Sequence, residues 1–349
     1  MRELEPLRSR VDDALRAFLA ERRAEAVDES VADFVLPILD LVSRGGKRLR
    51  AALCMLGWAG AGGDAAGEAV VRGAASLELL HGCALIHDDV MDRSATRRGG
   101  PTLHQGFAVR HGADGWRGSS EQFGVGAAIA AGDLCLVWAD RLLRESGLSA
   151  QALERGRPVY DAMRAETIRG QYLDLVAQAR GSLDVDEALA VARAKTSACT
   201  TTGPLCFGGA LAGAGEELAA AYEAYGAALG LAFQLRDDLL GAFADPAEIG
   251  KPSGDDLRDG KCTVLLAEAY QRLDVIGRAR LRQLVGRRME DTVGETRELV
   301  ERSGAREAVE ERIRVLGKQA VEALDAVSVE GGVGVREGLV GLVDAVMNG

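Results

Sequence analysis

The chain has 349 residues, an apolar fraction of 47% and a formal net charge of −11. This apolar content is enough for a sizeable core, and the negative balance argues against general nucleic-acid affinity because a polyanion would be repelled by the average surface. Only seven residues are proline and 4% are aromatic, so local propensity favours helices over strands. No linker of the usual kind divides the chain, and we expect one domain over residues 1–349.

Apolar residues recur at spacings of three and four along most of the chain, which predicts an all-α helical bundle. The expected helices cover residues 3–25, 30–43, 47–59, 65–93, 121–145, 149–179, 184–200, 215–243, 260–272, 275–286, 292–325 and 334–347. Two polar segments rich in Gly, Pro and Asp, 111–124 and 244–261, are expected to be loops.

The N-terminal region is amphipathic and charged, and it lacks the apolar centre of a signal peptide. No window approaches 18 uninterrupted apolar residues, so we expect no transmembrane segment. The six cysteines never form a C-x-x-C pair and most sit in apolar stretches, which is typical of buried thiols in a reducing cytosol. We therefore expect a cytoplasmic protein.

The segment "LIHDDVMDRSATRRGG" places three aspartates within five positions directly after an apolar run. At about 100° per helical residue, His81, Asp88 and Asp92 fall within about 40° of one another and share one face. Like charges at an i, i+4 spacing repel unless a cation lies between them. Mg²⁺ prefers oxygen ligands and is usually held by one or two carboxylates together with substrate phosphates, so the pattern indicates a magnesium and phosphate site.

Basic residues and a second acidic helix end support this interpretation. Arg97 and Arg98 follow the first motif, and guanidinium groups match phosphate oxygens geometrically. The segment "FQLRDDLLGAFADP" ends another apolar helix in Asp237 and Asp238, with Gln234 one turn earlier. Two acidic helix ends in one bundle could face each other across a cavity.

The ordered motifs G-G-K-R-x-R, E-x-x-H, H-D-D-x-x-D, R-R-G-x-P-T, G-D, G-Q-x-x-D, K-T, F-Q-x-x-D-D, G-K and G-K resemble those of the trans-isoprenyl diphosphate synthases, the polyprenyl synthetase family. The resemblance covers about residues 30–270. It implies a single-domain helical bundle of the isoprenoid synthase type with a deep central apolar pocket, usually in a homodimer. It also implies Mg²⁺-dependent head-to-tail condensation of isopentenyl diphosphate with an allylic prenyl diphosphate.

Motif alignment with this family implies the site residues. Magnesium would be held by Asp88, Asp92 and Asp237, with Asp89 and Asp238 assisting. Isopentenyl diphosphate would be held by Lys47, Arg50, His81 and Arg98. The allylic diphosphate would be surrounded by Arg97, Lys195, Thr196, Gln234, Lys251 and Lys261, with Gln171 and Asp174 in support.

Two features of the resemblance leave alternatives open. Arg48 is as basic as Arg50, and the choice of Arg50 rests on family analogy alone. In the second motif the position four after Asp237 is Gly241 where the family commonly has an aspartate, so we expect activity to survive with weaker magnesium affinity. Asp245, two turns after Asp237, is a weaker candidate for a substitute ligand.

Product length is expected to depend on Cys83 and Ala84, which lie one turn before the first motif. Family members with short products often place an aromatic ring here as a floor, and two small residues leave room for a longer chain. Geranylgeranyl diphosphate is therefore the favoured product, with farnesyl or longer diphosphates as alternatives. Met55 or Trp58 on a neighbouring helix could supply a floor instead.

Three other functions compete with this prediction. A terpene cyclase shares the acidic motif but does not need the second diphosphate site formed by G-G-K-R-L-R, His81 and Arg98. A non-catalytic regulatory subunit would be compatible with Gly241, and a plain helical scaffold would explain the amphipathic helices but not the ordered ligands. His87 is expected to pack between helices, and His104 and His111 are expected in loops or on helix surfaces.

Overall fold

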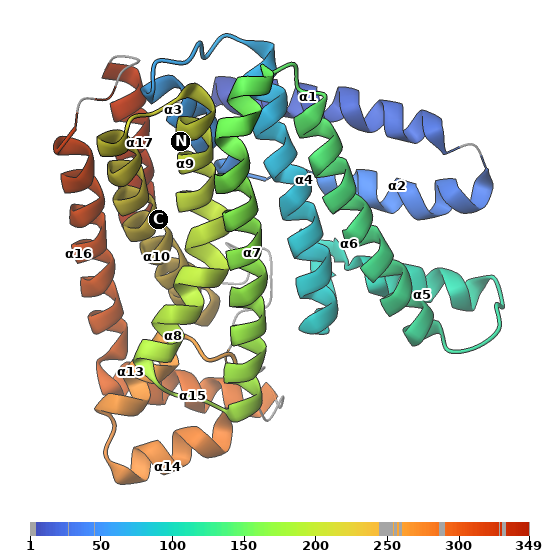
Figure 1. Cartoon of the computed structure of the whole chain (residues 1–349). Coiled ribbons are helices and arrows are strands. Elements are labelled where there is room, and N and C mark those ends of the chain that lie inside the picture. The colour runs from blue at the N-terminus through green and yellow to red at the C-terminus, as the bar shows by residue number, and fades with distance from the viewer. Residues whose placement is uncertain are drawn as a thin grey trace.

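The computed structural model describes residues 5–26, 28–44, 46–243, 254, 257, 260–285, 290–327, 329 and 333–348, without the side chains of residues 290, 291 and 333. Across this part of the chain the fold is all-α apart from one small hairpin, as the periodicity predicts (Figure 1). The first helices are α1 (Glu5–Glu25), α2 (Glu29–Ser43), α3 (Leu49–Gly60), α4 (Glu68–Met91), α5 (Leu103–Ala113), α6 (Ser120–Arg144) and α7 (Ala150–Arg180). They are followed by α8 (Val185–Ala192), the π-helix η2 (Arg193–Thr202), α9 (Gly203–Ala212), α10 (Glu216–Phe243), α13 (Val264–Arg272), α14 (Val275–Leu284), α15 (Glu290–Ser303), α16 (Ala305–Asp325) and α17 (Val333–Asn348). The hairpin pairs β1 (Thr96–Arg97) with β2 (Gly100–Pro101).

Three apolar clusters hold the helices together. The first cluster contains residues from every helix between α1 and α7 and from α9, among them Cys83, Tyr160 and Phe207. A second joins α8, α10 and α13 to α16, and a third packs α3, α9, α10, α16 and α17 around the buried rings of Tyr222 and Tyr225. Figure 1 shows α7 beside α8 and α9 in the centre, α16 and α17 on one side, and α1, α2 and α5 projecting on the other.

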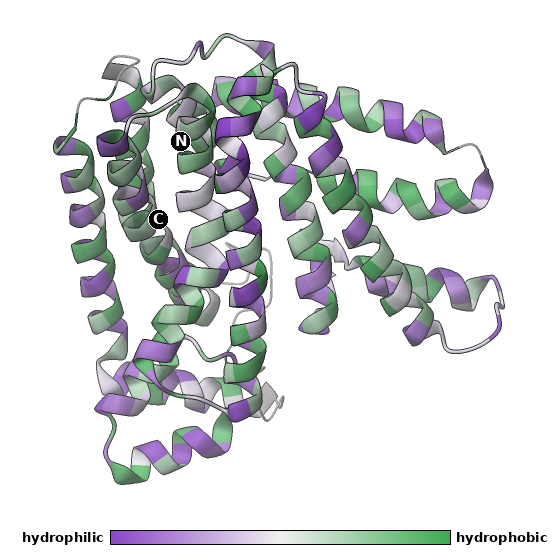
Figure 2. Cartoon of the chain, viewed as in Figure 1, coloured by the Kyte–Doolittle hydropathy of each residue, from purple (hydrophilic) through white to green (hydrophobic). Residues whose placement is uncertain are grey.

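Helices α4 and α6 are each long and apolar enough to cross a membrane by length and mean hydropathy, which is 1.4 for both. Mean hydropathy over a window can be high even when single polar residues interrupt the window. It is therefore a more permissive criterion than the uninterrupted run of 18 apolar residues that was required of the sequence. Within the fold, 67% of the apolar window of α4 is buried, which is typical of a core helix, against 39% for α6. Figure 2 shows extended hydrophobic runs along both helices.

Most of the expected helices are confirmed within a few residues, but five details differ from the sequence prediction. Helices α5 and α9 were not expected, and α5 with α6 shortens the expected loop at 111–124 to 114–119. The expected helix at 184–200 is α8 continued by the π-helix η2. The expected helix at 292–325 is two helices, because Gly304 adopts the left-handed conformation (φ 72°) that glycine tolerates best. The expected loop at 244–261 lies largely outside the described residues.

Candidate active site

The first acidic motif lies at the C-terminal end of α4. The backbone N–H of Asp92 donates to the carbonyl of Asp88 at 2.8 Å, so the helical register extends through both residues and their side chains share a face. Asp89 is 2% exposed and the side chain of Asp92 is 6% exposed. Buried carboxylates require cationic or hydrogen-bonding partners.

Three cations, Lys195, Lys261 and Arg97, supply these partners. Lys195 of η2 donates to Asp88 Oδ1 at 2.9 Å and to Asp174 Oδ2 of α7 at 2.6 Å. Lys261 lies 2.9 Å from Asp92 Oδ2. These contacts draw residues from both halves of the chain to the end of α4.

Arg97 covers the remaining carboxylate of the motif. Its Nε donates to Asp89 Oδ1 at 2.9 Å, and its guanidinium lies 3.7 Å from Asp88 Oδ2. The β1–β2 hairpin presents Arg97 through a two-residue turn in which Arg98 (φ 51°) and Gly99 (φ 74°) both have positive φ. Positive φ at both central residues is the signature of the tight hairpin turn whose twist matches its strands. Arg98 is thereby strained, a condition that clusters at functional sites.

The second acidic motif connects to the first through consecutive residues of η2. Thr196, next to Lys195, donates to Gln234 Oε1 at 2.6 Å, and Gln234 Nε2 donates to Asp238 Oδ1 at 2.7 Å. Asp237 follows Gln234 by three residues, about one helical turn, and its side chain is exposed. Both acidic helix ends therefore converge on the Lys195–Thr196 step.

Glycines on the neighbouring helices let η2 lie this close. A Cβ on Gly170 of α7 would fall 2.3 Å from the backbone nitrogen of Lys195. On α10, a Cβ on Gly230 would fall 2.7 Å from Cα of Ser197, and one on Gly226 would fall 2.5 Å from Cα of Thr202. A π-helix is rare and often marks a functional site. Its backbone here occupies space that only glycine leaves on both sides.

The structure separates the two arginines that the sequence left open. Arg48 is 4% exposed and adopts a left-handed conformation (φ 48°) at the start of α3. It pairs with Asp12 at 2.8 Å and with the buried Glu78 at 3.4 Å, which are contacts of the packed core. Arg50 instead donates to Thr200 Oγ1 of η2 at 2.7 Å, and its Nε is buried without a hydrogen-bond partner. Arg50 therefore contacts η2, whereas Arg48 is held by carboxylates elsewhere, and the choice of Arg50 as a diphosphate ligand stays a prediction.

Several of the basic candidates act electrostatically on His81. Burial, followed by the positive charges of Arg50, Arg98, Arg97 and Arg48, lowers the pKa of His81 well below its ordinary value. The imidazole is therefore neutral at physiological pH and can accept or donate a hydrogen bond. Lys47 precedes α3 and is exposed.

Neighbouring opposite charges shift the pKa values of Asp88 and Lys195. Burial raises the pKa of Asp88, but Lys195, Lys261 and Arg97 outweigh it, so the pKa lies below the ordinary value. Burial lowers the pKa of Lys195, and Asp88 and Asp174 more than offset that effect. Asp88 and Lys195 are thus held as a charged pair.

The donor set fits a divalent ion that also binds phosphate. Across the described ranges, no three Asp, Glu, His or Cys side chains are grouped closely enough to hold a metal ion alone. Asp88 and Asp92 nevertheless offer carboxylate oxygens on one face, and Asp92 Oδ1 is buried without a hydrogen-bond partner. Two carboxylates completed by substrate phosphates and water are the usual environment of Mg²⁺, so these residues suit it.

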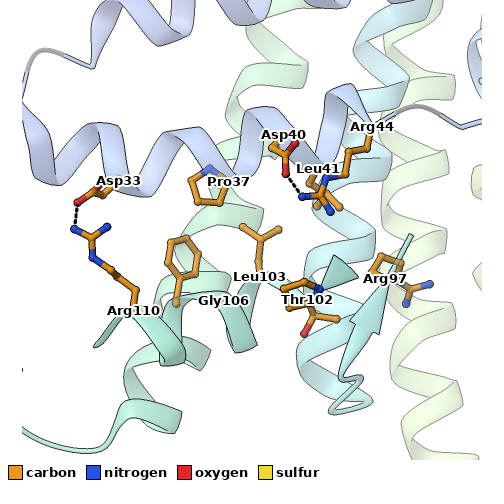
Figure 3. Close-up of a pocket in the computed structure, with 12 residues that line it drawn as sticks. Asp33, Pro37, Asp40, Leu41, Arg44, Arg97, Thr102, Leu103, Gly106 and Arg110 are labelled. Carbon is orange, nitrogen blue, oxygen red and sulfur yellow. Dashed lines mark hydrogen bonds and ion pairs between the residues drawn. The ribbon is translucent and has the colours of Figure 1, made fainter. Parts of the chain in front are cut away.

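A cavity of about 230 Å³ lies beside the hairpin, between α2 and α5 (Figure 3). Pro37, Leu41 and Phe107 form its apolar walls, and the ion pair between Asp33 and Arg110 closes one end. Arg97 borders the cavity, but Figure 3 shows its guanidinium directed away from the side chains of α2. The acidic motifs do not line it. It is therefore distinct from the deep central pocket expected from the sequence, which stays a prediction.

The remaining sequence candidates occupy definite places. Gln171 donates to Met91 Sδ at 3.4 Å, next to the first motif, and Gln178 holds the Asp174 carboxylate at 3.1 Å. Cys83 is buried and Ala84 is partly buried on α4. Lys251 and Asp245 lie outside the described residues.

Two histidines contradict the sequence expectation and one agrees with it. His104 and His111 are buried, at 6% and 3% exposure, because each packs where α5 meets α6. His111 Nε2 donates to the Arg117 carbonyl at 3.1 Å, and Nδ1 lies 2.8 Å from Ser120 Oγ. His87 packs between α4 and α6 as expected, with Nε2 3.1 Å from the Ile129 carbonyl.

Thr200 is a further candidate residue that the sequence motifs do not single out. It joins Arg50 to η2 and lies four residues after Thr196 on the same π-helix. The signal was present in the threonine run of "KTSACTTTGP", of which only the first two residues were used.

Comparison with known proteins agrees with this geometry. The family model for polyprenyl synthetase matches residues 33–302. A short chain isoprenyl diphosphate synthase of Methanothermobacter thermautotrophicus is 33% identical over 302 residues, covering 85% of this chain and 86% of the relative. A geranylfarnesyl diphosphate synthase of Aeropyrum pernix is 35% identical over 302 residues, covering 84% and 89%.

A solved structure extends the similarity to the whole chain. It is geranylgeranyl pyrophosphate synthase from Corynebacterium glutamicum, complexed with isoprenyl diphosphate and magnesium, at 40% identity, 99% coverage of both chains and a TM-score of 0.94. The fold and the matches together define an all-helical prenyltransferase. The chain belongs to the polyprenyl synthetase family.

Proposed function

We propose that this prenyltransferase condenses isopentenyl diphosphate head to tail with an allylic prenyl diphosphate, using Mg²⁺ and releasing pyrophosphate. The observation that carries the proposal is the Lys195–Thr196 step of η2, where Lys195 contacts the first acidic motif and Thr196 reaches the second through Gln234. A cyclase would have no use for the second basic group formed by Arg50, Arg98 and His81.

In this proposal Asp88, Asp92 and Asp237 would hold Mg²⁺, with Asp89 and Asp238 assisting. When bound, the metal would supply positive charge to the diphosphate leaving group. Lys195 and Lys261 contact Asp88 and Asp92, and on substrate binding their ammonium groups would turn to phosphate oxygens.

The residues of the chain suit ionisation of an allylic carbon–oxygen bond. Negative charge would grow on the departing diphosphate, and Arg97, Lys195 and Lys261, which contact the first acidic motif, would stabilise it. Arg50, Arg98 and Lys47 would hold isopentenyl diphosphate, and neutral His81 would donate a hydrogen bond to it. The apolar cluster that contains Cys83 would shelter the allylic cation from water.

We infer that the product is geranylgeranyl diphosphate. Small Cys83 and Ala84 would leave space below the motif, and Tyr160 packs against Phe207 at a tilt in the same apolar cluster, with ring centroids 5.3 Å apart. Tyr160 precedes Asp174 by 14 residues on α7, about 21 Å of helix, so this ring pair would form the floor. Ala84→Phe should shorten the product and Tyr160→Ala should lengthen it, as mass spectrometry of the dephosphorylated alcohols would show. Unchanged products in both variants would contradict this inference.

We also propose a cytoplasmic homodimer. Helix α6 exposes Phe123, Ile129 and Val137 along one apolar helix, with Val137 58% exposed. Such a surface is typical of a face that a second copy covers. Light scattering of the purified chain would give twice the monomer mass, and Val137→Asp together with Ile129→Asp would shift it to the monomer.

The experiment that tests the reaction uses the purified chain with Mg²⁺, isopentenyl diphosphate and dimethylallyl, geranyl or farnesyl diphosphate in turn. We expect pyrophosphate release that requires isopentenyl diphosphate. Release from the allylic substrate alone would instead indicate a cyclase. No turnover with any primer would indicate a regulatory subunit.

A further inference from the structure

Helix α14 carries two exposed β-branched residues at its first turn. Val275 and Ile276 are 82% and 80% exposed, the highest values among the large apolar residues of the described chain. Leu281 and Leu284 on the opposite side are buried, so α14 is anchored and its outer face is fixed. Asp274 caps the helix by accepting from the Gly277 N–H at 2.7 Å, which holds the two side chains outward at the tip.

Arginines flank this apolar pair on both sides. At about 100° per residue, Arg278 and Arg282 fall on one flank of the outer face and Arg280 falls on the other. Arg280 pairs with Glu295 at 2.5 Å. Arg278 and Arg282 have no carboxylate partner among the described side chains, and both lie over the ring of Tyr270.

This distribution of charge contrasts with the chain as a whole. Residues 272–285 contain four arginines and one aspartate, whereas the whole chain carries a net charge of −11. A second copy would bring arginine against arginine, which disfavours self-association through this face. An anionic partner is favoured, and it must accept two exposed apolar side chains without a preformed groove. A lipid surface meets both conditions, because apolar groups enter the acyl boundary while the arginine heads stay at the anionic headgroups.

We propose that the outer face of α14 docks the protein peripherally on an anionic lipid bilayer. Figure 1 shows α14 at the lower edge of the molecule, the end towards which α4 runs to the acidic motif. Docking there would place the membrane at the end of the molecule where substrates bind. That functional consequence, delivery of an amphiphilic product to the bilayer, rests on the proposed function, but the docking itself does not.

Co-sedimentation with vesicles, without substrate or Mg²⁺, tests the docking. We expect binding to vesicles of phosphatidylcholine mixed with phosphatidylglycerol, little binding to phosphatidylcholine alone, and weaker binding as salt rises. The double variant Arg278→Gln/Arg282→Gln should lower the partition coefficient about 25-fold, at about fivefold per arginine. Val275→Ser/Ile276→Ser should lower it at least about tenfold.

Matched controls separate this face from general stickiness. Val109→Ser on α5, at 72% exposure, and Arg157→Gln on α7 remove comparable groups elsewhere and should leave binding unchanged. Absence of binding by the folded wild-type chain, or equal losses in the control variants, would overturn the proposal. Because the assay contains no substrate, its failure is distinct from failure of the proposed reaction.

Discussion

The two acidic helix ends differ in the number of carboxylates that they offer. The end of α4 has three carboxylates, each matched by a cation from a different segment: Lys195, Lys261 and Arg97. The end of α10 has Asp237 and Asp238 and then Gly241, where a further carboxylate would share the face. The α4 end therefore offers three carboxylates and the α10 end two, so we expect the α4 end to contribute more to Mg²⁺ binding.

The largest expected effect follows from neutralising that centre. Asp88→Asn should lower kcat about 10² to 10³-fold, because it removes a proposed ligand of the Mg²⁺ that would supply positive charge to the leaving group. Asp238→Asn should lower kcat only about tenfold, since the amide oxygen can still accept from Gln234. Steady-state kinetics with saturating substrates would compare them, with exposed Asp161→Asn on α7 as the control. Equal losses at both helix ends would remove the asymmetry.

The π-helix η2, which links the two helix ends through Lys195 and Thr196, can be displaced by a substitution that changes no charged residue. Gly170→Ala should push the backbone of Lys195 and lower kcat at least about tenfold, with a loss of about 1–3 kcal/mol in the free energy of unfolding. Gly106→Ala on α5 is the control, because its Cβ would meet nothing within 4 Å. Urea unfolding and kinetics would measure both effects. Full activity in Gly170→Ala would show that the position of η2 does not matter.

Completing the second motif should reduce the difference between the two ends. Gly241→Asp should lower the Mg²⁺ concentration for half-maximal activity, on the order of tenfold, because additional carboxylates raise divalent-ion affinity. Gly241→Ala provides the control, since it improves helix propensity by about 1 kcal/mol without adding a ligand. If both variants shift the Mg²⁺ dependence alike, the missing carboxylate carries no penalty.

The smallest expected effect is on the basic side of the site. Arg50→Gln should raise the pKa of His81, because it removes the largest of the positive charges that keep the imidazole neutral. The pKa of His81 in the folded protein lies below its ordinary value, which applies to the unfolded chain. The free energy of unfolding is therefore unaffected by His81 above the ordinary pKa, and it decreases as the pH falls from there towards the folded pKa. NMR titration of the four histidines would report it, with Arg157→Gln as the control. An unshifted His81 would indicate that burial alone sets its pKa.

Periodicity and ordered motifs were sufficient to predict the long helices and the family, because each long helix has one repeated apolar face. They failed where small residues hide that face, as in α9 with its run of glycine and alanine, and where one glycine turns the chain, as at Gly304. The π-helical register of η2 has no sequence signature, since it depends on glycines in α7 and α10. Likewise the sequence alone does not distinguish Arg50 from Arg48, because the ion pair between Arg48 and the buried Glu78 is visible only in the folded structure.

The central claim is that Asp88 and Asp237 act on one diphosphate. A double-mutant cycle of Asp88→Asn and Asp237→Asn tests it through the Mg²⁺-dependent Kd of an unreactive allylic thiodiphosphate, measured by calorimetry. Residues that share a ligand should show a coupling free energy of about 1 kcal/mol or more. Losses that add to within about 0.5 kcal/mol would mean that the two helix ends work independently, which would contradict the account.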